Sequence, residues 1–256
     1  MLQTWLQALP FLLGAGFVTW LISVQQRNVT IVDTLWSLMF VIAAFSYAAS
    51  TLPAGPRAQL VLVLVTAWGL RLAFYLSRRN HGHEEDRRYQ KIRRRNEPGF
   101  TWKSLYLVFG LQAVLAWIIS LPLLGGIAGD AGALGLLDYA GVALWCIGIY
   151  FEAVGDWQLT RFKADPANEG KVMDQGLWGL TRHPNYFGDF CVWWGFGLIA
   201  LAAGAWWSLV GPAIMSALLL RVSGVALLER DIGKRRPGYA EYIRRTNAFF
   251  PGPRKS

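Results

Sequence analysis

The chain has 256 residues, of which 54% are hydrophobic and only 16% are charged. An average soluble domain carries roughly 25% charged residues, so this chain has too few charges to cover a water-soluble globule of its size. Its 25 Lys and Arg outnumber its 16 Asp and Glu, which gives a net charge of +9. Because the basic residues are grouped between long apolar runs, the composition excludes a nucleic-acid-binding protein and favours a membrane protein.

The cysteines argue against a disulfide-rich or metal-binding protein, and the N-terminal segment argues against a signal peptide. Cys146 and Cys191 lie inside apolar runs and not at metal-ligand spacing, so neither a disulfide framework nor a metal site is expected. The first apolar run has no charged segment before it and no small-residue cleavage site after it. We therefore interpret residues 2–24 as a retained membrane span rather than a signal peptide.

Seven apolar stretches have close to the roughly 20 residues that a helix needs to cross a bilayer. They cover residues 4–24, 31–51, 58–77, 103–123, 135–157, 186–204 and 207–228. The last two are nearly contiguous, and their combined length favours a tight hairpin over one long or re-entrant element. The sequence thus predicts an all-α polytopic membrane protein, with seven transmembrane helices in one domain over residues 1–256.

The basic residues also predict an orientation. With the C-terminus in the cytoplasm, 22 of the 25 Lys and Arg fall on the cytoplasmic side, as the positive-inside rule requires. Seven spans then leave the N-terminus outside. We expect a multi-pass protein of a bacterial inner membrane, with its polar chemistry on the cytoplasmic side.

Six ionisable residues lie within the predicted spans, where a central charge costs roughly 2.5–3.5 kcal/mol on insertion scales. They are Asp33, Arg71, Glu152, Asp156, Asp189 and Arg221. One interpretation is that those near span ends reach the membrane surface or pair with one another. The other is a polar cavity open to the cytoplasm, which the two charge signs and the grouping on the inner halves of the spans favour.

The segment from residue 152 to residue 189 combines such carboxylates with groups suited to an anion. The side chains able to donate to phosphate are Lys163, Lys171, Arg182 and His183. Pro184 begins the next helix, and Asn185 and Tyr186 stand in its first turn, where backbone N–H groups are unpaired. The alternative for R-H-P-N-Y is an ordinary membrane-interface sequence, with Arg at lipid headgroups and Tyr in an aromatic belt.

Several motifs in the chain resemble the steroid 5α-reductase family in its bacterial membrane branch. They are D-W-Q-L-x-R-F-K from residue 156, G-L-W-G-L-T-R-H-P-N-Y-F-G-D from residue 176, R-x-S-G-V-x-L-L-E from residue 221, P-G-Y-A-E-Y from residue 237, D-T-L-W-S at 33–37 and E-D-R-R-Y at 85–89. The motifs R-H-P-x-Y and G-Y-x-x-Y also resemble membrane methyltransferases of the isoprenylcysteine and phospholipid type, which use S-adenosylmethionine.

The resemblance to the reductases implies an NADPH-dependent enzyme that saturates the C4=C5 bond of a 3-oxo-Δ4-steroid, with hydride transfer to C5 and protonation at C4. It implies a cofactor-binding half at about residues 135–256. The residues it implies for cofactor binding are Asn80, Arg88, Glu152, Asp156, Lys163, Lys171, Arg182, His183, Asn185, Tyr186, Asp189 and Arg221.

The resemblance also implies a catalytic pair that polarises the 3-oxo group of the substrate. Asp33 is the only acidic residue in the corresponding part of the chain, and it has no basic residue nearby in sequence. We expect it to be protonated in an apolar cavity and to donate a hydrogen bond. Trp68 stands where the family has a catalytic Tyr, so Tyr89 is assigned to that role, with Tyr75 as the alternative. The residues implied to contact the substrate are Asp33, Trp36, Trp68 and Trp193.

Two alternatives to the reductase stay open at this stage. One is the methyltransferase, which would use Arg182, His183, Tyr239 and Glu241. The other is a sterol- or lipid-binding membrane protein without catalytic activity. In each case the expected partners are a hydrophobic small molecule and membrane lipids, with no nucleic acid.

Overall fold

A computed structural model describes residues 1–51, 55–129, 132–222 and 238–255. All regular structure in these ranges is helical, apart from an isolated bridge between Thr181 and Asn247. The predicted all-α polytopic membrane fold is therefore confirmed. The chain divides into two compact units, one formed by residues 1–134 with 200–208 and one by residues 135–199 with 209–256. A single functional domain over the whole chain stays a prediction.

Five helical stretches are long and apolar enough to cross a membrane. They are α1 (Leu2–Gln26), α2 (Ile31–Ala49), α3 (Pro56–Asn80), the stretch Phe100–Ile119 and α8 (Leu136–Ala164). The helix α10 (Pro184–Ala202) has 19 residues but is not among these five, and Trp206–Arg221 forms a shorter apolar stretch. The structure thus supports a multi-pass membrane protein, and the predicted number of seven spans is not confirmed.

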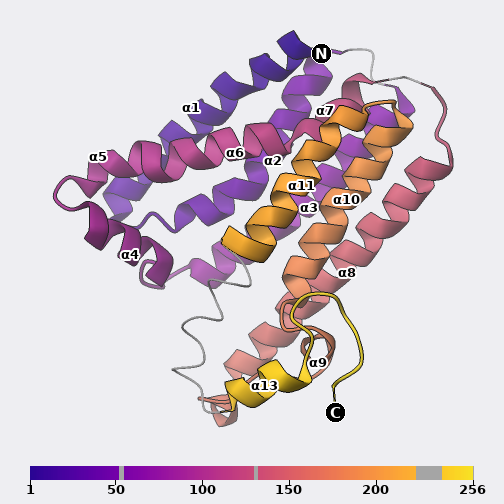
Figure 1. The fold of residues 1–256 in the computed structure, drawn as a ribbon. Coiled ribbons are helices and arrows are strands. Elements are labelled where there is room, and N and C mark those ends of the chain that lie inside the picture. Colours follow the sequence, from indigo (N-terminus) through magenta and orange to yellow (C-terminus); the bar gives the residue numbers. More distant parts are fainter. Residues whose placement is uncertain (52–54, 130–131, 223–237, 256) are drawn as a thin grey trace. The chain divides into compact units, whose positions relative to one another are not determined.

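In the first unit, α2 packs between α1 and α3 (Figure 1). The Ser37 hydroxyl of α2 donates to the carbonyl of Gly69 on α3 at 3.0 Å. Tyr47, near the other end of α2, shares a hydrogen bond of 2.7 Å with the Ser120 hydroxyl. These contacts satisfy polar groups inside an apolar interface, where an unpaired group would be costly.

The fourth long helical stretch is irregular and is followed by a short helix. It consists of α5 (Phe100–Ser104), a π-helix over Leu105–Gly110 and α6 (Leu111–Ile119), and α7 (Leu121–Ala128) comes after it. The stretch runs antiparallel to α1. At one end the Trp20 indole donates to the Thr101 carbonyl at 2.9 Å. At the other end Trp5 and Trp117 stack at 3.8 Å, and each indole donates to the other residue's carbonyl.

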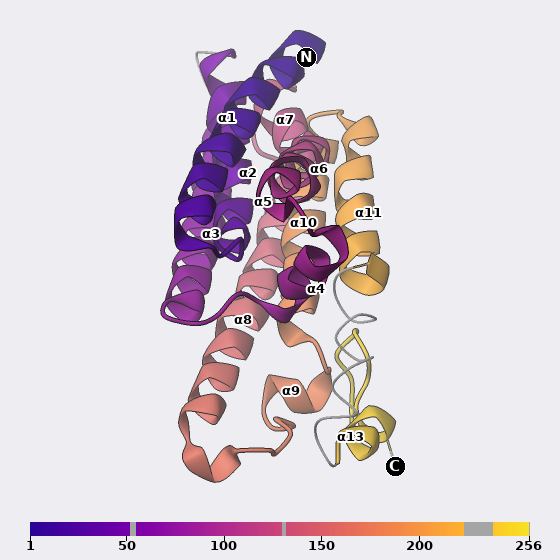
Figure 2. The ribbon, with the colours of Figure 1, turned by 90° about the vertical axis from the view of Figure 1, so that its left-hand side faces the viewer.

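The second unit is built on an antiparallel pair, α8 and α10 (Figure 2). Glycines face each other across this pair, so the two backbones approach closely: a Cβ on Gly148 would lie 2.6 Å from the Gly188 carbonyl oxygen, and one on Gly141 would lie 2.7 Å from the Gly195 carbonyl oxygen. Small residues of this kind allow close helix packing in membranes. The unit's other described helices are α9 (Leu177–Leu180), α11 (Val210–Ala217), a π-helix over Leu218–Val222 and α13 (Tyr239–Arg245).

Candidate functional site

A cluster of polar side chains in the first unit joins two motifs that are far apart in the sequence. Asp33 stands in the first turn of α2, and Tyr89 belongs to α4 (Arg87–Asn96). The Tyr89 hydroxyl donates to Asp33 Oδ1 at 2.6 Å, although the two residues are 56 positions apart. Arg88 Nη2 donates to the other carboxylate oxygen, Oδ2, at 2.7 Å. We call Asp33, Arg88 and Tyr89 the tyrosine cluster.

Asp86 explains why α4 begins where it does. Its carboxylate accepts the backbone N–H of Arg88 at 2.8 Å, which caps the first turn of α4. The same carboxylate accepts Arg88 Nε at 3.0 Å, and the backbone N–H of Asp86 donates to Thr30 Oγ1 at 2.9 Å. One acidic residue therefore orients the Arg88 side chain and holds the start of α4 against the start of α2.

Glu85 makes a second connection between the same two segments. Its carboxylate accepts the Val29 N–H at 3.0 Å and two hydrogen bonds from the Arg93 guanidinium at 2.7 and 2.8 Å. Although desolvation opposes the shift, these hydrogen bonds lower the pKa of Glu85. Glu85 is therefore ionised at neutral pH, and the motif E-D-R-R-Y is fixed against the loop between α1 and α2.

The surroundings of the tyrosine cluster keep the phenol of Tyr89 protonated. Tyr89 is only 6% exposed and belongs to a hydrophobic core cluster that includes Trp20 and Phe100. Burial, together with the negative charge of Asp33, raises its pKa well above the ordinary value of 10.0. Burial alone would lower the pKa of Arg88, but its interactions with Asp33, Tyr89 and Asp86 together outweigh burial and raise that pKa. The cluster is thus a neutral phenol and a guanidinium on one carboxylate.

The structure brings two basic residues to Asp33 from distant parts of the sequence. Arg88 lies 2.7 Å from its carboxylate and Arg79 lies 4.0 Å away. Both carboxylate oxygens of Asp33 accept hydrogen bonds, one from the Arg88 guanidinium and one from the Tyr89 phenol, so Asp33 is the acceptor in this arrangement. Tyr89 is therefore the proton donor of this pair, and Asp33 holds it. That either residue takes part in catalysis stays a prediction.

The aromatic residues implied to contact a substrate lie further along α2 and α3. Trp36 is one helical turn beyond Asp33, its ring is 5.0 Å from that of Phe40, and Phe40 is 5.8 Å from Trp68. Trp68 is fully buried, whereas Trp36 is partly exposed. Tyr75, the alternative catalytic residue, lies near the Arg79 guanidinium at 5.8 Å.

Two of the cofactor residues implied by the resemblance, Asn80 and Arg88, lie in the first unit. The Asn80 side-chain oxygen accepts from Arg79 Nε at 3.1 Å at the end of α3. Arg88 is held by Asp33 and Asp86 as described above. The other ten implied cofactor residues belong to the second unit.

In the second unit, the structure brings several of the predicted polar residues to one end of the α8–α10 pair. Glu152 and Asp156 of α8 are only 2% and 4% exposed. A Cβ on Gly188 of α10 would lie 2.7 Å from Glu152 Cγ, so Glu152 packs directly against α10, next to the position of Asp189. Trp193, one turn further along α10, is fully buried.

Arg182 has a structural role that the sequence analysis missed. Its Nη1 atom donates to the carbonyls of Thr246 and Ile243 at 2.6 and 3.1 Å, at the end of α13. Its backbone N–H donates to the Asn247 carbonyl at 2.9 Å. The last carbonyls of a helix have no partner within the helix, and Arg182 supplies one. Nearby, the Tyr242 hydroxyl donates to the Trp178 carbonyl at 2.6 Å, so α9 and α13 lie side by side (Figure 2).

The remaining predicted cofactor residues are distributed over the second unit. His183 is buried and stacks on Tyr186 with ring centroids 5.5 Å apart. Asn185 Oδ1 accepts the Tyr186 N–H at 3.1 Å. Lys163, Lys171 and Arg221 are exposed. Most of the motif that begins at Arg221 lies outside the described residues.

We expect Arg182→Met to loosen α13 without unfolding the second unit. Charged hydrogen bonds are worth about 1.5–3 kcal/mol, so amide hydrogen exchange of residues 239–249 should rise about tenfold or more. The control is Arg245→Met, because the Arg245 side chain pairs with the exposed Glu241 of the same helix. Equal exchange in the two variants would contradict the capping role of Arg182.

Comparison with known proteins identifies relatives but no activity. The family model that matches residues 19–246 is described as a protein of unknown function, DUF1295. An uncharacterized protein of Schizosaccharomyces pombe, C594.04c, is 25% identical over an alignment that covers 94% of this chain and 80% of the yeast protein. No solved structure matches the chain. The match to DUF1295 shows that the assignment to the steroid 5α-reductase family is wrong, so residue roles must be argued from this chain's own chemistry.

Proposed function

The chain belongs to the DUF1295 family, and from its own residues we propose that it is a membrane-embedded enzyme that uses NADPH to saturate the C4=C5 bond of a 3-oxo-Δ4-steroid or a similar lipid enone. The observation that carries this proposal is the buried Tyr89 phenol, held by the Asp33 carboxylate at 2.6 Å. The proposal includes cytoplasmic placement of this chemistry, in a bacterial inner membrane with the N-terminus outside, because that orientation puts 22 of the 25 Lys and Arg inside.

The tyrosine cluster fits the chemical demand of enone reduction. Hydride addition at C5 moves negative charge to the 3-oxo oxygen, and a hydrogen-bond donor at that oxygen stabilises the transition state. Tyr89 stays protonated because its pKa is raised by burial and by Asp33. Rotation of the Tyr89 hydroxyl from Asp33 towards the oxo group directs the donor to the substrate, while Arg88 continues to balance the charge of Asp33. A proton from water then adds to C4 and completes the reduction.

The residues beyond the cluster favour a flat apolar substrate. Along α2, Trp36 and Phe40 follow Asp33 and lead to Trp68 of α3. Aromatic side chains offer large apolar faces against which fused rings pack. A 3-oxo-steroid combines such an apolar body with one terminal oxygen, which suits an aromatic side chain one helical turn from Asp33 and a proton donor at Tyr89.

The second unit contains cationic and acceptor side chains of the kinds that bind the phosphates and ribose hydroxyls of NADPH. Lys163 and Lys171 are exposed cations suited to its phosphates. The buried carboxylates of Glu152 and Asp156 are acceptors of the kind that bind ribose hydroxyls. Arg182 is not included, because its guanidinium caps α13. When bound, NADPH supplies the hydride.

The test is an assay of the purified protein with NADPH and testosterone in lipid nanodiscs. We expect a product heavier by two hydrogens with the ketone intact, and slower reduction when NADH replaces NADPH. Heat-denatured protein is the control. Methylation of a lipid acceptor, or S-adenosylmethionine in the purified protein without enone reduction, would contradict the proposal and favour the methyltransferase.

A further inference from the structure

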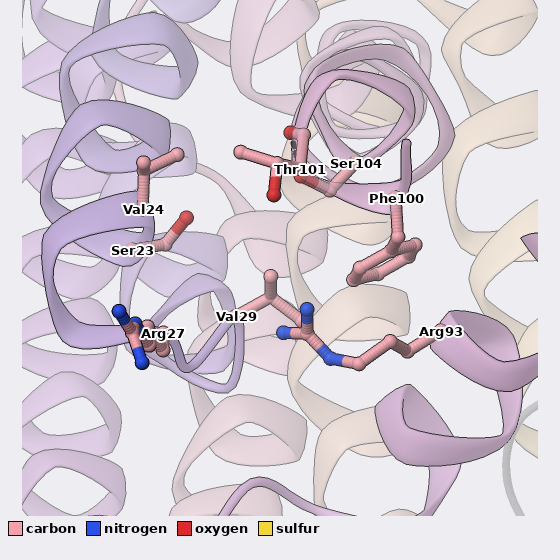
Figure 3. Close-up of a pocket in the computed structure, with 8 residues that line it drawn as sticks. All are labelled: Ser23, Val24, Arg27, Val29, Arg93, Phe100, Thr101 and Ser104. Carbon is pink, nitrogen blue, oxygen red and sulfur yellow. Dashed lines mark hydrogen bonds between the residues drawn. The ribbon is translucent and has the colours of Figure 1, made fainter. Parts of the chain in front are cut away.

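A seam in the first unit, between α1 and the antiparallel stretch Phe100–Ile119, holds a polar pocket of about 360 Å³. Ser23 and Arg27 line it from the end of α1, Arg93 from α4, and Thr101 and Ser104 from α5 (Figure 3). The Ser23 hydroxyl donates to the Trp20 carbonyl at 2.8 Å, so its proton is used within α1 and the guanidinium groups are the donors left for an anion. The pocket therefore carries hydroxyl and guanidinium groups at the end of a membrane-spanning helix.

The two arginines of the pocket differ in how much charge they offer a ligand. Arg93 is held by the Glu85 carboxylate at 2.7 Å and lies over the Phe100 ring at 4.5 Å. Its charge is balanced and its position is fixed. Arg27 is exposed, and none of the carboxylates in the described part of the chain pairs with it. Arg27 thus gives the pocket a net positive charge, which fits an anion.

The same seam continues into an apolar pocket of about 330 Å³. Its lining includes Leu13, Gly16 and Phe17 of α1 and Leu105, Tyr106 and Phe109 of the π-helix. Phe17 and Arg27 are ten residues apart, so about 15 Å of helix separates the apolar lining from the unpaired guanidinium. Because the two elements run antiparallel, the π-helix that follows α5 meets the part of α1 that precedes Ser23.

The two pockets together have the chemistry of a phospholipid. Phe17 and Tyr106 are 48% and 61% exposed, which suits a helix surface that contacts acyl chains. Trp20 and Trp102, with rings 5.3 Å apart, lie beside the polar pocket, and Trp is enriched where a membrane meets water. A soluble anion would use only the polar pocket and would leave the apolar one unexplained.

We propose that this seam binds one anionic phospholipid, with its phosphate at Arg27 and one acyl chain along the π-helix. The site shares no residue with the tyrosine cluster and does not depend on the proposed reductase activity. The positive charge of Arg27 selects a lipid with a net negative headgroup over a zwitterionic one. The apolar pocket selects a ligand with an acyl chain.

The backbone at Arg27 allows a variant that removes the charge without loss of folding. Arg27 has φ 52° and ψ 31°, a left-handed conformation that glycine adopts more easily. Arg27→Gly should therefore fold at least as well as the wild type. Arg27→Lys keeps the charge, and Arg94→Gln removes one exposed positive charge from α4 at a position that does not line the pocket.

The experiment measures binding of dioleoyl phosphatidylglycerol to delipidated protein by native mass spectrometry. We expect Arg27→Gly to weaken binding about tenfold, Arg27→Lys and Arg94→Gln to bind as the wild type does, and phosphatidylcholine to bind less tightly. Wild-type binding by Arg27→Gly would overturn the site. Displacement of the lipid by an equal concentration of glycerol phosphate would show a soluble-anion site instead and would also overturn the proposal.

Discussion

Tyr89→Phe is expected to lower the turnover of an enone substrate by about 10²–10³-fold, the range typical of a lost hydrogen-bond donor to a developing oxyanion. The substitution removes only the hydroxyl that Asp33 holds at 2.6 Å. The ring stays in the hydrophobic cluster with Trp20 and Phe100, so the variant should fold. Arg88 still pairs with Asp33 in the variant, which leaves no uncompensated charge.

The reduction assay in nanodiscs checks this expectation, with Tyr75→Phe as the matched control. Tyr75 lies in the same unit and should retain wild-type turnover. Because Tyr89 is proposed to act on the transition state, the loss should fall on kcat more than on KM. NADPH affinity should be unchanged, since the cofactor groups belong to the second unit. A Tyr89→Phe enzyme with normal kcat would remove Tyr89 from the mechanism and leave Tyr75 as the next candidate.

The membrane helices were predictable because their signal is local. A bilayer requires about 20 apolar residues in succession, and the predicted spans 4–24, 31–51 and 58–77 correspond to α1, α2 and α3. The predicted span 103–123 proved more complex, since a π-helix interrupts it and α7 begins at Leu121. An apolar run shows that a segment is buried in lipid but not which backbone hydrogen-bond pattern it adopts.

The partners of the candidate residues were not predictable in the same way. The sequence indicates both Asp33 and Tyr89 as candidates, but it shows no basic partner near Asp33 along the chain. The pairing with Arg88 depends on how the segment before α4 folds back on the start of α2, where Glu85 and Asp86 bind the α1–α2 loop. Contacts across more than 50 positions leave no periodic signal in one sequence.

Arg182 shows why a short motif misled the family assignment. R-H-P-N-Y has the composition of an anion site at a helix start, and that composition does not reveal whether the guanidinium faces a ligand or the protein. In the structure it faces the carbonyls at the end of α13. A motif required for packing in this way does not by itself identify an activity.

Gly148→Ala is expected to destabilise the protein by about 2 kcal/mol, within the range for an overfilled interface. The added Cβ would lie 2.6 Å from the Gly188 carbonyl oxygen and 2.7 Å from the Val192 nitrogen. Both are backbone atoms of α10, so no side chain can rotate away and the two helices must separate. A hydrogen bond elsewhere in the second unit resists that movement. The Trp178 indole of α9 donates to the Gly155 carbonyl of α8 at 3.0 Å and so ties α8 to α9.

The matched control is Gly14→Ala, since a Cβ on Gly14 of α1 would meet nothing within 4 Å. In a helix interior Ala is favoured over Gly by about 0.5–1 kcal/mol, so this variant should unfold at the same or a higher temperature. Thermal unfolding in detergent, followed by the loss of helical circular dichroism, should therefore separate the two substitutions in opposite directions. Unchanged stability of Gly148→Ala would mean that α8 and α10 are not in close backbone contact. The buried position of Glu152 beside Gly188, and with it the cofactor site proposed for the second unit, would then lose its structural basis.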